Sequence, residues 1–211
     1  NITYSDGTTA GPVTIKPGSS HVFDQAAETH NSTVFAASVT SNTQIAVVVI
    51  EETSNQILYA YTGFIAGTSN PVLPLVNANN GGNYTGIQIQ NSGASNTTVT
   101  ISYMPSFAGT ACTETQTIPA GGSKTFALSA FGGNALSGMT TNCVKQKFVG
   151  SATVTTNSTG MPLMAVVNQV NATSGEAYGS FDVAKASDTV VFPLIQDRNS
   201  GWYTGFSVMN V

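Results

Sequence analysis

The chain offers few residues whose types and spacing could support catalysis. It has two histidines, His21 and His30, and ten acidic residues spread thinly over 211 positions. Glu51 and Glu52 are adjacent, but neighbouring residues on a strand point to opposite faces, so they cannot act as a general acid and base on one substrate. His21 aligns with Lys124 in the internal repeat described below, which indicates a solvent-facing position. We therefore expect no catalytic residue.

Binding motifs for metals, nucleotides and cofactors are also missing from the sequence. It contains no nucleophile elbow, zinc-protease, P-loop, dinucleotide-binding or EF-hand pattern. The glycine-rich segment 79–83 precedes an expected strand, whereas a phosphate-binding loop precedes a helix. Asp188 and the pair Asp197-Arg198 fit loops and turns, and no acidic cluster is available for calcium. The sequence predicts a protein that is not an enzyme and has no cofactor and no metal site.

The composition narrows the class of protein further. Charged residues make up 8% of the chain, against roughly 25% in an ordinary soluble domain. With six Lys and Arg residues and a net charge of −4, the chain has no basic surface for nucleic acid or an anionic membrane. No apolar stretch approaches the roughly 18 residues that a membrane span needs. Frequent Thr, Val, Ile, Tyr and Phe favour strands, so we expect an all-β fold.

Two features favour an extracellular location. Cys112 and Cys143 are the two cysteines and suit one disulfide in an oxidising compartment, with two buried free thiols as the alternative. The sequence begins at Asn1 without a signal-peptide pattern, as a processed secreted chain or an excised fragment would. Six Asn-x-Ser/Thr sequons are candidate acceptors for covalent glycans, at Asn1, Asn31, Asn83, Asn96, Asn157 and Asn171.

An internal duplication is the strongest signal in the sequence. Val72–Leu75 and Tyr84–Asn91 each return 119 residues later, at Val191–Leu194 and Tyr203–Asn210. Shorter blocks return after 99, 103 and 115 residues, namely Ile2–Tyr4 as Ile101–Tyr103, Thr14–Phe23 as Thr117–Phe126, and Val39–Asn42 as Val154–Asn157. The order is kept and the spacing only grows, so the second copy carries insertions. Each cysteine lies in an insertion, and we therefore expect a disulfide that pins two extra loops together.

Alternating patterns within the copies predict half-buried strands. Ile87 and Ile89 alternate with glutamines, and Val99–Tyr103 alternates with threonine and serine. The run Ile45–Ile50 is continuously apolar and predicts a central strand covered on both faces. About seven short strands per copy, separated by turn signals, predict two tandem immunoglobulin-like β-sandwiches.

The two copies do not begin at the same point of the repeat. Asn1 aligns with Thr100, so the first copy has no counterpart of the strand Tyr84–Asn91, and that pattern returns only at Tyr203–Asn210. We therefore predict a strand-deficient sandwich over 1–76, a complete sandwich over 77–195 and a spare strand over 196–211. An incomplete sandwich exposes core residues and unpaired backbone groups, which another strand must cover.

The block Pro74–Asn91 and its copy Pro193–Asn210 resemble tandem immunoglobulin-like repeats in large secreted surface proteins of filamentous bacteria. A strand-deficient sandwich with a spare strand also resembles, more loosely, the subunits of donor-strand filaments in bacterial and archaeal pili. These resemblances imply extracellular sandwiches that associate with one another. Chaperone–usher pilins donate an N-terminal strand, whereas the candidate donor here is C-terminal.

These features predict a structural subunit of an extracellular filament or surface fibre that serves adhesion or a matrix. The spare strand would complete the first sandwich of the next unit in a head-to-tail homopolymer, with Trp202, Tyr203, Phe206, Val208 and Asn210 as the polymerisation residues. Two other routes are a covalent array, in which the unit is one period of a longer chain, and folding back of the strand onto its own first sandwich. The alternative function is a glycan-binding or adhesin module of a larger secreted protein, with Tyr84, Trp202 and Tyr203 as its sugar platform.

Overall fold

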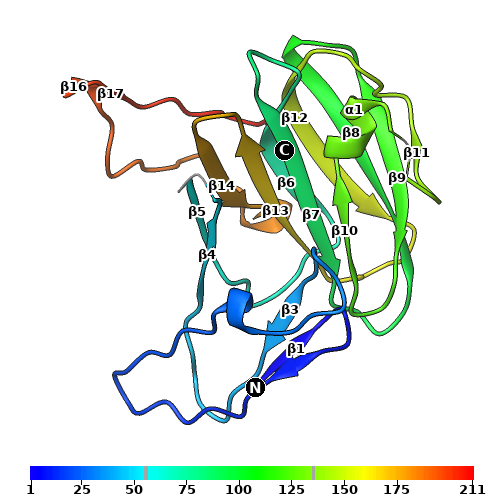
Figure 1. The fold of residues 1–211 in the computed structure, drawn as a ribbon. Coiled ribbons are helices and arrows are strands. Elements are labelled where there is room, and N and C mark those ends of the chain that lie inside the picture. Colours follow the sequence, from blue (N-terminus) through cyan, green and yellow to red (C-terminus); the bar gives the residue numbers. More distant parts are fainter. Residues whose placement is uncertain (55–56, 135) are drawn as a thin grey trace.

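The computed structural model describes residues 1–54, 57–134 and 136–211, and it is predominantly β (Figure 1). Its strands form five antiparallel sheets. Helical structure in these residues is limited to α1 (Leu128–Gly132) and two 3-10 turns, η1 (Gln25–Ala27) and η2 (Val183–Lys185). None of the helices described there is long and apolar enough to cross a membrane. The expected all-β class is confirmed.

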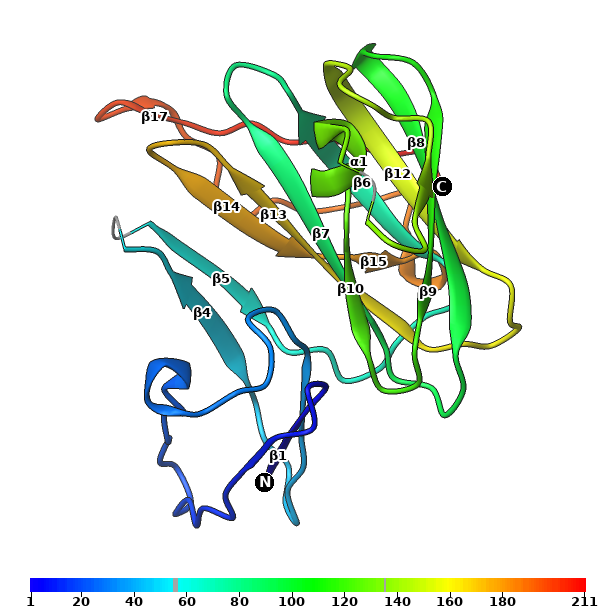
Figure 2. The same ribbon diagram turned by 45° about the vertical axis from the view of Figure 1, so that its right-hand side comes forward.

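Two of the sheets pack face to face and form the central sandwich (Figure 2). The four-stranded sheet has the order β10-β7-β13-β14, from β7 (Tyr84–Asn91), β10 (Ser123–Phe126), β13 (Leu163–Val170) and β14 (Gly175–Gly179). The six-stranded sheet has the order β11-β9-β8-β12-β6-β15, from β6 (Pro71–Ala78), β8 (Thr97–Ala108), β9 (Cys112–Ile118), β11 (Thr140–Thr141), β12 (Phe148–Thr156) and β15 (Phe181–Asp182).

The core of the central sandwich follows the alternation seen in the sequence. Ile87 and Ile89 on β7 are fully buried, while the glutamines between them are half-buried. Val99, Ile101 and Tyr103 on β8 are buried in the same alternating way. These side chains meet Phe126, Phe148 and Leu163 from other strands in one continuous cluster. The period-2 pattern therefore predicted the buried face of these strands correctly.

The N-terminal region, residues 1–64, contains two small sheets. The first has the order β2-β1-β3, from β1 (Ile2–Tyr4), β2 (Thr9–Ala10) and β3 (Ala37–Val39). The second is a hairpin of β4 (Val48–Glu52) and β5 (Leu58–Thr62). The hairpin lies beside β14, where Tyr59 packs so closely on Gly175 that a Cβ there would be 2.1 Å from its ring. The Asn168 amide on β13 also donates to Glu51 over 2.9 Å.

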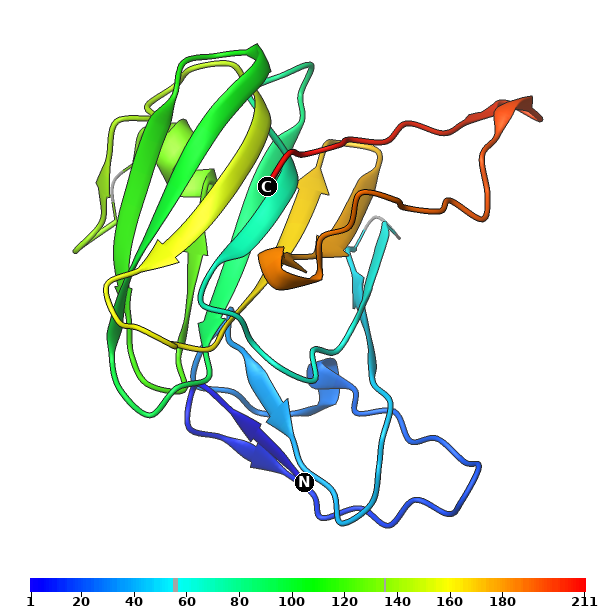
Figure 3. The ribbon, with the colours of Figure 1, turned by 180° about the vertical axis from the view of Figure 1, so that it is seen from behind.

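The C-terminal arm, residues 186–211, is extended and largely exposed. It leaves the central sandwich after η2, runs outward, turns through the short pair β16 (Asp197–Asn199) and β17 (Trp202–Tyr203), and returns toward the sandwich (Figures 1 and 3). The outgoing and returning segments touch through Phe192 and Phe206, whose ring centroids are 5.1 Å apart. The arm therefore has two antiparallel halves joined by one turn.

The expected domain limits differ from the observed strands at both ends. The limit after residue 76 falls within β6, which pairs with β12 and so belongs to the central sandwich. At the other end, β15 is the last strand of the sandwich, and residues 186–195 already belong to the arm. The apolar block Val72–Leu75 opens the central sandwich and does not close the N-terminal region.

The expected central strand over Ile45–Ile50 is wrong. The strand there is β4, which begins at Val48 and pairs with β5 alone among the described residues. Val48 and Ile50 are 63% and 64% exposed. A continuous apolar run indicates that a strand is to be covered on both faces, but it does not indicate which chain supplies the cover.

Candidate functional site

The arm repeats the backbone conformation of the connection between β6 and β7. That connection has φ values of 50°, 59° and 82° at Asn79, Gly81 and Gly82. Positions 119 residues later in the arm have φ values of 54°, 52° and 86°, at Arg198, Ser200 and Gly201. Positive φ is uncommon outside glycine, so agreement at three positions indicates the same turn.

Hydrogen bonds in the turn are repeated as well. In the central sandwich the Thr85 hydroxyl accepts from the Asn77 backbone N–H over 2.9 Å. In the arm the Thr204 hydroxyl accepts from the Gln196 backbone N–H over 2.8 Å, at the same spacing. The bridge between Asn80 and Asn83 recurs as the pairing of Asn199 with Trp202, 119 residues later. The arm therefore carries an equivalent of the β6–β7 unit in which the turn is formed, while its residues outside β16 and β17 are not in strands.

The β6–β7 unit and its equivalent in the arm differ in how far their apolar side chains are buried. β6 and β7 lie inside the central sandwich, where Leu73 and Ile89 are completely buried. Their equivalents Phe192 and Val208 are 49% and 82% exposed. The large apolar side chains of the arm that lie exposed are Val190, Val191, Phe192, Leu194, Ile195, Trp202, Tyr203, Phe206, Val208 and Val211. Apolar surface of this extent on one segment is typical of an interaction site.

The N-terminal sheet has the same register as the corresponding part of the central sandwich. On β1 and β3, Ile2 faces Val39 and Tyr4 faces Ala37. On β8 and β12, Ile101 faces Val154 and Tyr103 faces Ala152, which are the repeat equivalents of these residues. The order β2-β1-β3 thus matches β9-β8-β12. In the central sandwich β6 follows β12, whereas in the described residues nothing pairs with the other edge of β3.

Three aromatic rings repeat the same packing in the two regions. Tyr103 meets Phe131 and Phe148 edge-on, with ring centroids 5.0 and 6.0 Å away. Tyr4 meets His30 and Phe35 edge-on, with ring centroids 4.6 and 5.5 Å away. The rings of Phe131 and Phe148 are tilted by 39° relative to each other, and those of His30 and Phe35 by 32°. His30 therefore occupies the place of Phe131, and Phe35 that of Phe148.

The hairpin of β4 and β5 matches β13 and β14. Val49 faces Tyr61 and Ile50 faces Ala60, while Val167 faces Tyr178 and Asn168 faces Ala177. In the central sandwich β13 lies between β14 and β7. Among the described residues β4 has β5 on one edge and no strand on the other. The open edge of β4 is therefore the edge at which β7 binds in the central sandwich.

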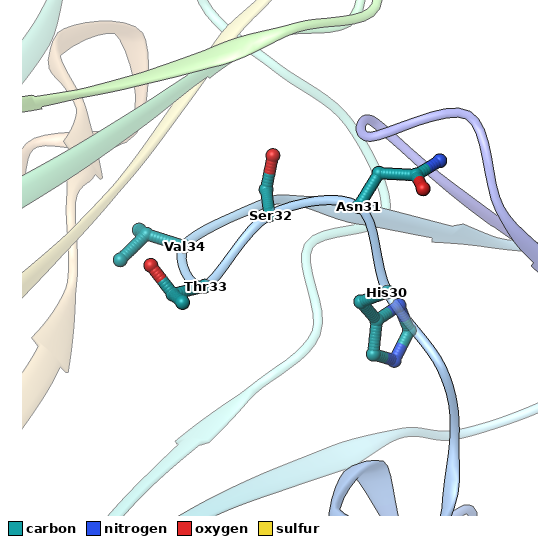
Figure 4. A pocket seen from close by; sticks show the side chains of 5 residues that line it. All are labelled: His30, Asn31, Ser32, Thr33 and Val34. Carbon is teal, nitrogen blue, oxygen red and sulfur yellow. The ribbon is translucent and has the colours of Figure 1, made fainter.

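A hollow of about 500 Å³ lies in the N-terminal region, at the loop that leads into β3 (Figure 4). Its lining is one continuous loop segment, His30–Val34. The loop is fixed by Asp6, which accepts hydrogen bonds from the backbone and hydroxyl of Thr8 and from the backbone of Asn31. Burial opposes the charge, but these hydrogen bonds and nearby His30 outweigh it and lower the pKa of Asp6 to about 2.

Asp6, Thr8 and His30 have the residue types of a catalytic triad but not its geometry. The Thr8 hydroxyl lies 3.0 Å from His30 Nδ1 and donates to Asp6 over 2.6 Å. The other Asp6 oxygen lies 3.4 Å from the same His30 Nδ1. In a triad the hydroxyl and the carboxylate contact opposite nitrogens of the imidazole. Here both lie near Nδ1, and the contacts hold the turn at Asp6–Thr8 against the loop that begins at His30. Asp6-Gly7 was readable as a turn in the sequence, but its contact with His30 was not.

The cysteines and the most deeply buried acid belong to the central sandwich. Cys112 and Cys143 form a disulfide across 31 residues, as expected from the insertions. Glu114 on β9 accepts hydrogen bonds from the Tyr103 hydroxyl over 2.8 Å, the Ala127 backbone over 2.7 Å and the Gln116 amide over 2.9 Å. Burial of this carboxyl raises its pKa. No pattern in the sequence predicted this network.

The residues expected to form a sugar platform do not lie together. Tyr84 begins β7 in the central sandwich, whereas Trp202 and Tyr203 form β17 on the arm (Figure 1). Tyr84 and Tyr203 are repeat equivalents, so each occupies the same place in a different unit. Trp202 and Tyr203 are consecutive strand residues and point to opposite sides. The arrangement gives no shared aromatic face.

The sequons lie on loops and strand ends. Asn1, Asn31, Asn96 and Asn157 are exposed, and Asn83 and Asn171 are half-buried and bonded to each other over 3.0 Å. A glycan is attached to the side-chain nitrogen, and in Asn31 this nitrogen donates to the Asp6 carbonyl. In Asn96 and Asn157 only the side-chain oxygen has a protein partner among the described contacts.

Comparisons with protein-family models, with curated proteins and with solved structures found no match to this chain.

Proposed function

We propose that this protein is a structural subunit of an extracellular filament and that it polymerises head to tail by strand complementation. One observation carries the proposal, namely that the arm has the turn of a β6–β7 unit with its apolar side chains exposed. In this proposal the N-terminal region is an immunoglobulin-like sandwich that lacks these strands. Its open edges at β3 and β4 are where β6 and β7 bind in the equivalent sheets.

The apolar side chains of the arm would contribute free energy to association. By analogy with β6 and β7, six arm residues would become buried, namely Val190, Val191, Phe192, Ile195, Phe206 and Val208. At about 1.5–3 kcal/mol each, their burial would contribute roughly 9–18 kcal/mol. This gain is of the same order as the roughly 4–15 kcal/mol that association costs in lost freedom of motion. Backbone hydrogen bonds at both open edges add to the gain.

The donor and the acceptor are different parts of the same chain. A contact between unlike surfaces repeats head to tail, and it gives a fibre wherever the rotation between successive copies does not close a ring. The disulfide supports assembly in an oxidising compartment such as the cell exterior. A low content of charged side chains leaves few unpaired charges to be buried when subunits pack together.

The experiment compares two substitutions on the returning half of the arm. Val208→Asp places a charge at the equivalent of buried Ile89, whereas Ser207→Asp places one at the equivalent of half-buried Gln88. Purified protein is examined by negative-stain microscopy and analytical ultracentrifugation. We expect filaments from the wild type and from Ser207→Asp, and monomers from Val208→Asp with an intact central sandwich.

Deletion of residues 202–211 provides a second test. It should abolish filaments while the circular dichroism of the central sandwich is retained, because these residues lie outside that sandwich. Filaments that form normally after the deletion, or a wild type that stays monomeric at high concentration, would contradict the proposal.

A further inference from the structure

We infer that the arm enters the neighbouring copy as a two-strand unit, one strand for each sheet, and that its turn seats in the hollow at His30–Val34. The partner is a second copy of this chain, and the inference rests on the proposed function. The sequence pattern pointed to one spare strand, Tyr203–Asn210, whereas the turn repeated at Arg198–Gly201 joins that strand to residues 190–197, the sequence equivalent of β6. The central sandwich serves as the template, because its β6–β7 unit is already docked.

The first half of the arm pairs with β3 in a defined register. On the template, Leu73 of β6 faces Ala152 and Val72 faces Thr153 of β12. The equivalents are Phe192 and Val191 of the arm, and Ala37 and Ser38 of β3. Phe192 of one copy is therefore placed opposite Ala37 of the next, and Val191 opposite Ser38. In both pairs a large side chain, Leu73 or Phe192, is opposite an alanine, Ala152 or Ala37.

The second half of the arm pairs with β4 in the other sheet. On the template, Ile87 faces Val167 and Gln88 faces Val166 of β13. The register of the β4–β5 hairpin makes Val49 the equivalent of Val167 and Val48 that of Val166. Phe206 of one copy is therefore placed opposite Val49 of the next, with Ser207 opposite Val48. This pairing covers the apolar run that remains exposed in the single chain.

Polar contacts of the template extend the match beyond the strands. The Tyr178 hydroxyl contacts both the N–H and the carbonyl of Leu75, at 3.2 and 2.5 Å. Tyr61 is the equivalent of Tyr178, and Leu194 is that of Leu75. The Tyr61 hydroxyl is thereby placed at the backbone of Leu194 from the neighbour.

The C-terminal end of the donated strand has a polar partner as well. On the template the buried Asn91 amide donates to the carbonyls of Ile118 and Pro119. Asn210 is the equivalent of Asn91, and the carbonyls correspond to Ile15 and Lys16. An asparagine at the end of the donated strand then ties it to the loop that follows β2.

The turn of the arm fits the hollow through Arg198. On the template the Asn79 amide donates to the carbonyls of Phe131 and Gln146, over 3.2 and 2.9 Å. The equivalent carbonyls belong to His30 and Thr33, which both line the hollow (Figure 4). Arg198 takes the place of Asn79 and is exposed in the single chain, where its ion-pair partner among the described residues is its neighbour Asp197, over 3.8 Å. The Asp6 carboxylate behind this loop supplies a negative charge for the guanidinium.

Paired cysteines test the two registers in assembled filaments. One variant carries Ser207→Cys with Val48→Cys, and another carries Val191→Cys with Ser38→Cys. Residues directly opposite on paired strands lie within disulfide reach. We expect mild oxidation to link subunits into covalent ladders on a denaturing gel. The native disulfide does not interfere, because Cys112 and Cys143 are buried.

In the matched controls the cysteine of the arm stays in place. The acceptor cysteine moves by two residues along the chain, which keeps it on the same face of the sheet. The controls combine Ser207→Cys with Ile50→Cys, and Val191→Cys with Thr40→Cys. We expect at least tenfold less linkage from the shifted pairs. Filaments that form but link equally well in both registers, or through one half of the arm alone, would overturn this inference and leave the proposed function standing. Failure to form filaments at all would instead count against the proposed function.

Substitutions of Arg198 test the seat of the turn. Arg198→Glu places a negative charge near Asp6, and Arg198→Gln is the neutral control with a similar backbone requirement at positive φ. We expect the critical concentration for assembly to rise at least tenfold for Arg198→Glu at low salt and to approach that of Arg198→Gln at high salt. Equal critical concentrations for the two variants at low salt would overturn the placement of the turn.

Discussion

The central sandwich and the N-terminal region share a strand register and an aromatic cluster but differ in closure. In the central sandwich β12 is flanked by β8 and β6, and the side chains between the sheets are almost all inaccessible. In the N-terminal region the buried apolar side chains of the first sheet are limited to Ile2, Tyr4 and Ala10, with Phe23 and Phe35 packed against them. Related patterns thus give a closed core in one region and an open one in the other.

The difference shows that local pattern and global closure are separate properties. Strand pairing and ring packing in the N-terminal region survive without the two strands that complete its equivalent. What is lost is burial, since Val48, Ile50 and Leu58 remain more than half exposed. Burial supplies most of the free energy of folding, so the two regions should differ widely in stability within a single chain.

The largest effect expected from this comparison concerns the third ring of each aromatic cluster. Phe148 is completely buried, and Phe148→Ala should cost about 3–5 kcal/mol in the free energy of unfolding of the monomer. Phe35 is only partly buried, so Phe35→Ala should change the unfolding of the central sandwich by less than about 0.5 kcal/mol. Urea titration followed by circular dichroism measures both. Equal losses would show that the two regions unfold as one unit.

The disulfide should provide the next largest difference. It closes a segment of 31 residues within the central sandwich, which corresponds to about 3–4 kcal/mol in the chain-entropy model. Replacing Cys112 and Cys143 by alanine should lower the stability of that sandwich by this amount. Hydrogen exchange in β1 and β3 should stay unchanged, because these strands lie outside the closed segment. Faster exchange there would mean that the N-terminal region depends on the central sandwich.

A smaller effect is expected at the equivalent tyrosines of β14 and β5. The Tyr178 hydroxyl bonds with the backbone of Leu75, and Tyr178→Phe should cost about 1 kcal/mol in the monomer. Tyr61→Phe should cost almost nothing in the monomer and should weaken the assembled filament. Thermal unfolding of the monomer and dilution of the filaments separate these outcomes. A similar loss for both tyrosines in the monomer would contradict the open edge at β4.

The smallest effect is opposite pH dependence in the two regions. The pKa of Glu114 is raised by burial, so its contribution is complete below about pH 4.5 and is lost as the pH rises through the folded-state value. The pKa of Asp6 is lowered to about 2, so its contribution is complete above about pH 4 and is lost as the pH falls toward 2. Hydrogen exchange between pH 5 and 2 should show loss of protection around Asp6 and no such loss around Glu114.

Two variants separate these carboxyl groups. Asp6→Asn should remove the acid sensitivity of the N-terminal region, since it removes the titrating group. Glu114→Gln should flatten the pH dependence of the central sandwich. An N-terminal region that gains protection on acidification would show that the sign for Asp6 is wrong.

Much of the fold could be read from the sequence because the duplication is regular. The period-2 pattern located β7 and the buried face of β8, and the insertions located the disulfide. The expected limit at residue 76 falls inside β6 because the block Val72–Leu75 has the same pattern whether it ends one sandwich or begins the next. The repeat of this block at Val191–Leu194 was assigned to the second sandwich for the same reason. The contact between Asp6 and His30 joins residues that are 24 positions apart in the chain. Because it depends on the course of a loop, no periodic pattern in the sequence predicts it.

The short connection between β6 and β7 has a consequence for which groove the arm can reach. In the central sandwich the β6–β7 unit is held beside its groove by continuous chain on both sides, at an effective concentration that a separate molecule cannot match. If copies associate as proposed, the arm of another copy would therefore not displace it, although the patterns are related. In a fibre built as proposed, one end would present an empty groove and the other an undocked arm. The two ends would be chemically unlike, so growth would have a polarity and each end would need a different terminator.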